Sequence, residues 1–370
     1  MTFPGKGGRV PGIGASTLEE FPMRVLFLHH QQRHPHTEEP GYNELYRPLM
    51  ASGLVEACGE WVYQSRLRAL IEACRSESGR DQVDFLIYRE ANRRLAEEFL
   101  DQVAQARPEL LVYSATWPNE SIHPELFIQA KERFPGLKLF CQLWDYDEDS
   151  HTYLWYEREI IACADLVSIP DSYYRVRRLR EGRPPYTDFT NTSVVHWLPT
   201  LPDPALFRLR PEVTPDLDVL VLGSSEGRRA ALIAGLAQRY GQGFRHVGGY
   251  QTNDATVPFT DYAAAIHRAR IVVNSQTVPH RVQVKGRVRE VLACRGFLLD
   301  QENAETLRYF RGSGVPLFTD FDDLIRQIDV FLSSPDRREG VKDKSYAWYC
   351  RMHALTDYVR TIARLTGVGQ

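Results

Sequence analysis

The stretch Asp218-Val-Leu-Val-Leu-Gly-Ser-Ser-Glu-Gly-Arg-Arg229 decides the fold. An apolar run at 218–222 ends at a glycine, and a helical pattern follows over 228–240. This order predicts a buried parallel strand that turns directly into a helix. The turn offers free backbone N–H groups, a helix N-terminus and guanidinium groups, which favour an anion, most naturally a diphosphate. The alternative interpretation is a tight β–α turn whose arginines point into solvent.

Strands and helices alternate on both sides of this stretch. Downstream, we expect strands at 244–247, 271–274 and 297–299, helices at 262–269, 286–293 and 321–332, and a final helical stretch at 342–365. Upstream, we expect strands at 23–29, 110–113, 137–143 and 165–169, with helices over 41–50, 93–106, 124–134 and 159–164. Residues 180–215 carry repeated prolines, as linkers do. The sequence therefore predicts an α/β protein of two domains with a ligand cleft between the carboxyl edges of their sheets.

Composition fits a globular enzyme. The chain has 370 residues, 43% of them hydrophobic, which suits two domains of ordinary size. A net charge of -3 gives no field that would attract nucleic acid. The six cysteines are scattered without metal-ligand spacing, and no apolar run approaches the ~20 residues of a membrane helix. The leader 1–22 has no signal-peptide core, so we expect a cytoplasmic protein.

A second group of charged residues begins a helix further along. Lys285 lies just ahead of the expected helix start at Gly286, and Arg287 and Glu290 are three residues apart on one face. A carboxylate there can accept both hydroxyls of a ribose, while Lys285 or Arg287 meets phosphates. A solvated helix with an internal Arg–Glu pair is the alternative.

These residues carry a family resemblance. The segment Arg287-Val-Arg-Glu-Val-Leu-Ala-Cys-Arg-Gly-Phe-Leu-Leu299 resembles the R-x-x-E-x-x-A-x-x-G helix of GT-B glycosyltransferases. The nearest group is the glycosyl transferase group 1-like family, and within it the spore-maturation-type proteins. Segments 318–332 and 334–339 also resemble the family, so that the likeness covers 218–340. In the first domain it is only architectural.

The resemblance implies a GT-B fold, in which two Rossmann-like domains face each other across a cleft and a C-terminal helix crosses back. The implied divisions are a flexible leader at 1–22, an acceptor domain at 23–205, a donor domain at 206–342 and the crossing helix at 343–370.

The resemblance also implies roles for individual residues. Glu290 matches the carboxylate that holds the donor ribose. The other donor-binding positions are Gly223, Ser224, Ser225 and Arg228 for the phosphates, Lys285 or Arg287 beside them, and Gly249 and Tyr250 facing the base. Many retaining members have two glutamates in an E-x7-E pattern. The first of these falls on Val282 in this chain, so only the second, at Glu290, is present.

Candidates for the catalytic base follow strands of the first domain. His29 and His30 follow the first strand, and Asp145 follows the strand 137–143. Histidine suits a base at neutral pH, and side chains at a strand's carboxyl end face a ligand. Loop residues that satisfy backbone groups are the alternative. We expect no metal, because arginine, lysine and helix dipoles can stabilise a departing diphosphate.

The predicted function is transfer of a hexose from a UDP- or GDP-type sugar to a glycan, lipid-linked, protein or small acceptor in glycan biosynthesis. The nucleoside-diphosphate sugar is a substrate, and no cofactor is expected. The alternative is a non-catalytic nucleotide-sugar or carbohydrate-binding protein with the same fold. The basic run Arg175-Val-Arg-Arg-Leu-Arg180 is too short for a nucleic-acid surface and suggests peripheral contact with an anionic membrane or with a lipid-phosphate acceptor.

Overall fold

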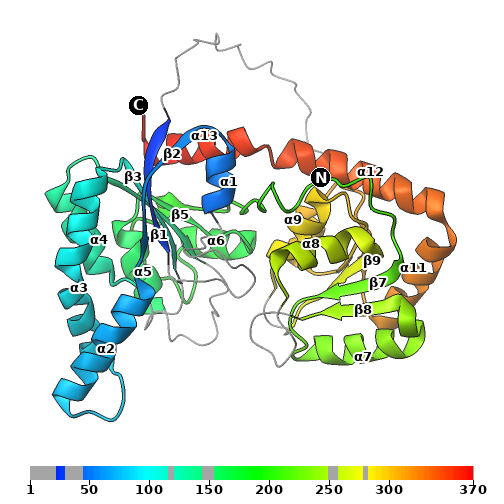
Figure 1. Ribbon diagram of the computed structural model, residues 1–370, viewed down its shortest axis with the longest axis horizontal. Coiled ribbons are helices and arrows are strands. Elements are labelled where there is room, and N and C mark those ends of the chain that lie inside the picture. The colour runs from blue at the N-terminus through cyan, green and yellow to red at the C-terminus, as the bar shows by residue number, and fades with distance from the viewer. Residues whose placement is uncertain are drawn as a thin grey trace, which may run out of the picture.

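Two parallel sheets organise the chain, as the sequence predicts (Figure 1). The computed structural model describes residues 22–29, 45–115, 121–143, 154–248, 257–277 and 282–369. Within them, each sheet is covered by apolar side chains on both faces, so that each domain has a core on either side of its strands.

The N-terminal sheet has the strand order β2-β1-β3-β4-β5-β6 in the described residues, and every neighbouring pair is parallel. Its strands are β1 (Met23–His29), β2 (Val55–Val62), β3 (Leu110–Ala115), β4 (Lys138–Leu143), β5 (Leu166–Ser168) and β6 (Val195–His196). Its helices are α1 (Tyr46–Ala51), α2 (Gln64–Ser78), α3 (Phe85–Ala106), α4 (Pro124–Arg133), α5 (Leu154–Cys163) and α6 (Tyr173–Arg180).

The C-terminal sheet has the order β11-β10-β9-β7-β8, again parallel throughout the described residues. Its strands are β7 (Leu217–Leu222), β8 (Phe244–Val247), β9 (Ala269–Asn274), β10 (Leu298–Gln301) and β11 (Leu317–Phe318). Its helices are α7 (Arg228–Tyr240), α8 (Phe259–Arg268), α9 (Gly286–Ala293), α10 (Ala304–Tyr309), α11 (Phe321–Ser333) and α12 (Pro335–Met352), with α13 (Leu355–Thr366) after them.

The C-terminal helical stretch differs from the expectation of one helix over 342–365. The structure has two helices, α12 and α13, with His353 and Ala354 between them in non-helical conformations. Burial and the charge of Arg289 lower the pKa of His353 to about 3, so this ring is neutral and Nε2 can accept from the Tyr309 hydroxyl, 2.8 Å away. That bond therefore ties the break between α12 and α13 to α10 of the C-terminal domain.

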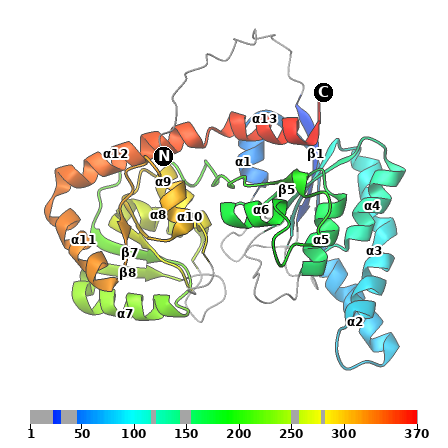
Figure 2. The same cartoon turned by 180° about the vertical axis from the view of Figure 1, so that it is seen from behind.

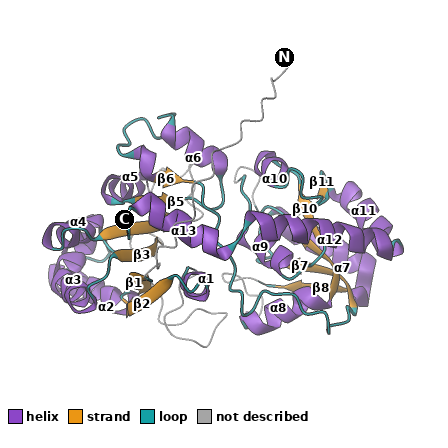
Figure 3. Cartoon of the chain, turned by 90° about the horizontal axis from the view of Figure 1, so that it is seen from above, coloured by secondary structure: helices purple, strands orange, loops and turns teal. Residues whose placement is uncertain are grey.

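The two helices pack against different domains. Figures 1 and 2 show α12 and α13 running along one side of both domains, and Figure 3 shows α13 above the N-terminal sheet. Trp348 of α12 packs in the C-terminal core, whereas Tyr358, Val359 and Ile362 of α13 pack in the N-terminal core, where α13 contacts β4, β5 and α1. Residues 355–366 are therefore a structural part of the N-terminal domain.

The proline-rich segment is more than a linker. Its residues Val195 and His196 form β6 at the edge of the N-terminal sheet. Leu201 packs in the N-terminal core and Phe207 in the C-terminal core, so the chain changes domain between these two side chains.

Several elements have no counterpart in the sequence prediction, among them β2, α2, α6 and α10. β2 reads Val-Glu-Ala-Cys-Gly-Glu-Trp-Val, and its glycine and two glutamates hide the strand pattern. α10 has only six residues and is fixed by a capping box between Asn303 and Thr306. No helix in the described ranges is both long and apolar enough to cross a membrane.

Candidate functional site

The turn between β7 and α7 is built around Gly223. This residue has a φ of +100°, a conformation that favours glycine. Its N–H donates to the Val247 carbonyl at 2.9 Å, and its own carbonyl lies 2.6 Å from Nε2 of His246. The guanidinium of Arg287 fills the space that a Cβ on Gly223 would need and donates to the Leu222 carbonyl. The turn after β7, in the first half of the C-terminal domain, therefore contacts α9, in the second half of that domain.

Arg229, which the sequence analysis did not select, holds this turn from inside. Its side chain is 1% exposed and donates to the Ser224 carbonyl at 3.1 Å and to the carbonyl of Ser275. Burial, then the nearby charge of Arg287, lower the pKa of Arg229 to about 9. Arg228, the predicted phosphate ligand, is exposed, and its backbone N–H donates to the Thr277 carbonyl at 3.2 Å. Ser224 and Ser225 lie half-buried at the same turn.

α9 begins at Gly286, as predicted, with Lys285 as its N-cap residue. Lys285, Arg287 and Glu290 are all half-buried. The Tyr262 hydroxyl of α8 donates to Oε2 of Glu290 at 2.8 Å. Burial raises the pKa of Glu290, and the hydrogen bond from Tyr262 and the charge of Arg287 oppose that rise. Arg287 thus contacts the Gly223 turn, and Glu290 follows one helical turn later on α9.

A buried polar pair lies at the carboxyl ends of the neighbouring strands. Asn274 ends β9 and is register-paired with Asp300 of β10, and Asn274 Nδ2 donates to Oδ1 of Asp300 at 2.7 Å. Both residues are at most 1% exposed, and Oδ2 of Asp300 has no hydrogen-bond partner in the described chain. Burial raises the pKa of Asp300 to about 7, against the charges of Arg287 and Arg229. Asn274 and Asp300 thus place a buried polar pair at the carboxyl end of the C-terminal sheet.

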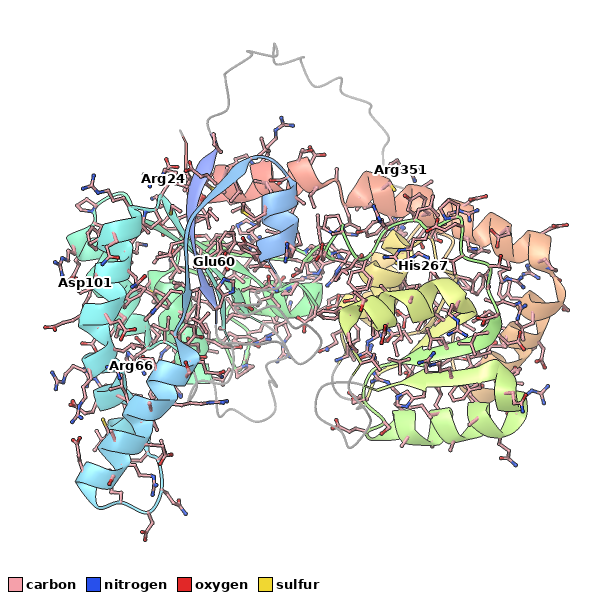
Figure 4. All side chains as sticks on the ribbon, in the orientation of Figure 1. Arg24, Glu60, Arg66, Asp101, His267 and Arg351 are labelled. Carbon is pink, nitrogen blue, oxygen red and sulfur yellow. The ribbon has the colours of Figure 1, made fainter. Side chains whose placement is uncertain are left out.

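The N-terminal sheet also becomes polar at its carboxyl end. His29 is fully buried there, with Nε2 3.0 Å from Oε2 of Glu60 on β2, a residue labelled in Figure 4. Gln142 of β4 is 0% exposed, and neither of its amide atoms has a partner in the part of the chain described. His29 therefore stays a candidate base held by a carboxylate. His30, Asp145, Gly249 and Tyr250 lie outside the described residues.

The basic run of α6 contacts the protein itself. Arg175 is buried and pairs with Glu157, and Arg177 pairs with Glu181 at 2.6 Å. Arg178 donates to the Pro184 carbonyl, and Arg180 lies 3.1 Å from Nδ1 of His196. These contacts account for the run within the fold.

Metal ligands do not cluster in the described residues. No group of three or more His, Cys, Asp or Glu side chains there could hold an ion. The acidic stretch Asp145-Tyr-Asp-Glu-Asp149 lies outside the described ranges.

The comparison with protein-family models matches the second domain, which contains the Gly223 turn and α9. Residues 215–367 match the model of a family described as glycosyl transferase-like. The C-terminal domain is glycosyltransferase-like. This match covers β7 to α13, and so includes the Gly223 turn, Arg287 and Glu290. No curated protein sequence matches the chain significantly.

Solved structures resemble the chain over nearly its whole length. An α-glucosyltransferase in complex with UDP aligns over 93% of this chain and 100% of its own, with 9% identity and a TM-score of 0.58. A UDP-N-acetylglucosamine 2-epimerase aligns over 94% and 97%, with 10% identity and a TM-score of 0.56. HepE from Anabaena, in complex with UDP and glucose, aligns over 92% and 98%, with 12% identity and a TM-score of 0.54.

These likenesses establish the fold of the whole chain. Because they span both sheets, the glycosyltransferase-like domain and its N-terminal partner together form the GT-B fold that the sequence predicts.

Proposed function

We propose that this chain is a hexosyltransferase that moves a sugar from a nucleoside-diphosphate sugar to a hydroxyl-bearing acceptor. One observation carries the proposal: Arg287 of α9 contacts the Gly223 turn, and Glu290 follows one helical turn later. Diphosphate and ribose are adjacent groups of one nucleotide, so adjacent cationic and acidic side chains suit them. The match of residues 215–367 to a glycosyl transferase-like family supports the same function, and so does the resemblance of 287–299 to the R-x-x-E-x-x-A-x-x-G helix of GT-B glycosyltransferases.

The donor diphosphate would lie against the turn formed by Gly223, Ser224 and Ser225, with Lys285 and Arg287 beside it. Here the positive end of α7 and two cationic side chains can stabilise the charge that develops on the leaving diphosphate. Glu290 would hold the ribose hydroxyls through its second oxygen, because Tyr262 already donates to Oε2. Gly249 and Tyr250 would face the base, and the UDP in two of the solved relatives supports uracil as that base.

The acceptor would bind at the carboxyl end of the N-terminal sheet. In the transfer, the bond between the anomeric carbon and the diphosphate oxygen breaks, and a bond from that carbon to the acceptor oxygen forms. The acceptor proton passes to a side-chain base or to the departing phosphate. Among the candidate bases, His29 has a supporting carboxylate in Glu60, and His30 and Asp145 follow strands of the same sheet edge.

Thermal denaturation with UDP, GDP and their sugars tests the donor site. A ligand at about 100 times its dissociation constant adds roughly 2.7 kcal/mol of stability, which raises the melting temperature by several degrees. We expect UDP to stabilise the native chain and Glu302→Gln, an exposed glutamate close in sequence, but not Glu290→Gln. Stabilisation of Glu290→Gln equal to that of the native chain would contradict the assigned role.

A non-catalytic nucleotide-sugar-binding protein is the second candidate, because Val282 stands where retaining relatives carry a glutamate. Its side chain is 39% exposed and offers no hydrogen bond to a sugar. Release of UDP from a UDP-sugar separates the two functions. Stabilisation by the sugar nucleotide with no release of UDP, in the presence of an acceptor panel or of water alone, would favour the binding protein.

A further inference from the structure

Glu305, in the first turn of α10, joins the two domains. Its side chain is 1% exposed. Its Oε1 accepts from the hydroxyl of Ser172 at 2.7 Å and from the backbone N–H of Tyr174 at 2.8 Å, both at the start of α6 in the N-terminal domain. A single carboxylate oxygen from one domain thus binds two groups of the other.

The start of α6 is a suitable partner for a carboxylate. The first N–H groups of a helix have no intrahelical acceptor, and the helix dipole favours negative charge there. The Ser172 hydroxyl caps α6 by accepting from the Arg175 N–H at 3.1 Å, and the Glu305 carboxylate accepts from the Tyr174 N–H. The cap of an N-terminal-domain helix is therefore completed by a C-terminal-domain residue.

Arg308, one turn after Glu305, strengthens the same junction. Its guanidinium carbon lies 3.3 Å from the ring centre of Tyr173 and 4.7 Å from that of Trp197. Trp197 packs against the cores of both domains. Cation–π contacts of this kind gain strength where they are shielded from water.

This junction is continuous with the segment that leads into α9. The carbonyl of Asp171, next to Ser172, accepts from the Val284 N–H at 2.8 Å. Gln276 holds the same segment from the donor side, because its Nε2 donates to the Gln283 carbonyl at 2.7 Å. Lys285 follows directly, so the N-cap of α9 is positioned by both domains.

We propose that Glu305 is a positioning residue that couples the arrangement of the two domains to the donor-binding end of α9. With Glu305 bound to the start of α6, the Asp171 carbonyl is held against Val284, and Lys285 and Arg287 are set beside the Gly223 turn. Without it, the loop before α6 and the segment before α9 loosen together. The consequence for nucleotide binding rests on the proposed function, whereas the coupling is a property of the ligand-free protein.

Hydrogen–deuterium exchange of the ligand-free chain tests the coupling. In Glu305→Ala, we expect amides in both 172–176 and 282–286 to exchange about tenfold faster or more, because hydrogen bonds to a charged acceptor are lost. Glu305→Gln keeps a carbonyl oxygen at the same place and should retain most of the protection. Glu302→Ala removes an exposed glutamate three residues away and should change neither segment.

Faster exchange of 172–176 with unchanged 282–286 would overturn the coupling, since Glu305 would then only cap α6. Unchanged exchange of both segments would overturn it as well. Should Glu305→Ala not fold, Ser172→Ala removes the hydroxyl bond to Glu305 together with the cap bond to the Arg175 N–H. Segment 172–176 then loosens in either case, so faster exchange of 282–286 is the expected result, and unchanged exchange of 282–286 would overturn the coupling.

UDP titration by calorimetry then tests the consequence at the donor site. We expect UDP to bind Glu305→Ala about fivefold more weakly or worse, the usual scale of coupling between sites, and Glu305→Gln nearly as tightly as the native chain. Faster exchange with unchanged UDP affinity would overturn the link to the donor site. Absence of UDP binding to the native chain would instead count against the proposed function, and the exchange result would still decide the coupling.

Discussion

The guanidinium of Arg287 lies against the backbone of Gly223 in the space where any other residue would carry its Cβ. The two residues are far apart in sequence, and their contact joins the turn after β7 to the start of α9. We therefore expect Gly223→Ala to displace Arg287 and to weaken UDP binding by about tenfold or more, equivalent to about 1.4 kcal/mol, measured by calorimetry.

Gly53→Ala is the matched control for that variant. Gly53 also has a positive φ, +71°, but nothing lies within 4 Å of its Cβ position. Gly53→Ala therefore introduces the same kind of backbone strain as Gly223→Ala but displaces no arginine. Equal UDP affinity for Gly223→Ala and Gly53→Ala would show that the Arg287 contact has no role in binding.

Arg229 and its neighbour Arg228 should behave oppositely. Arg229→Ala removes a buried guanidinium that binds carbonyls of two loops, and hydrogen bonds to a charged group contribute about 1.5–3 kcal/mol each. We expect the free energy of unfolding in urea to fall by at least about 3 kcal/mol. Arg228→Ala alters an exposed side chain and should change it by less than about 0.5 kcal/mol. Equal effects of the two variants would contradict this assignment.

Asp300 should make stability depend on pH. Burial raises its pKa from 3.8 to about 7, so the folded protein keeps a proton that the unfolded chain loses. Its contribution is most favourable below pH 4 and falls as the pH rises to about 7, by roughly 4 kcal/mol in all. In Asp300→Asn this loss should disappear, while the amide oxygen still accepts from Asn274.

Urea denaturation of the native chain and of Asp300→Asn at pH 5 and pH 7.5 measures this effect. The native chain should lose more stability than Asp300→Asn between these values, whereas Asp322→Asn, at an exposed site, should follow the native chain. Parallel curves for the native chain and Asp300→Asn would rule out a buried titrating acid.

The docking of α13 should be essential to the N-terminal domain. Ile362 is 0% exposed in that domain's core, and truncation of a buried isoleucine costs about 2–5 kcal/mol. We expect Ile362→Ala to lower the melting temperature by several degrees in a thermal scan. Met352→Ala, at a side chain that is 56% exposed, should leave it within about a degree.

Regular hydrophobic patterns made much of the fold predictable. The apolar run of β7 and the amphipathic α7 and α9 lie where the sequence places them, because burial and local propensity favour the same structure there. β2 and α10 escaped prediction, since tertiary pairing and a side-chain cap determine them more than periodicity does.

The site was predictable only in part. Gly223, Arg287 and Glu290 follow recognisable local signals, and the structure places Arg287 against the Gly223 turn. Which of two consecutive arginines is buried depends on the exact rotation of α7, so the sequence alone did not show that Arg229 holds the turn from inside, and Arg228 stays a predicted phosphate ligand. Asp300 and Glu305 carried no local signal, because their roles arise from partners distant in sequence.

The position of α13 has a consequence for how the protein is made. During synthesis, β1 to β6 leave the ribosome before residues 355–366 are made. Until then, Tyr358, Val359 and Ile362 do not yet cover their face of the first sheet. The nascent first domain must keep that apolar face from aggregating while the whole second sheet is translated. Its core can be completed only after translation has passed α13, so the first domain cannot finish folding on its own while the second domain is being translated.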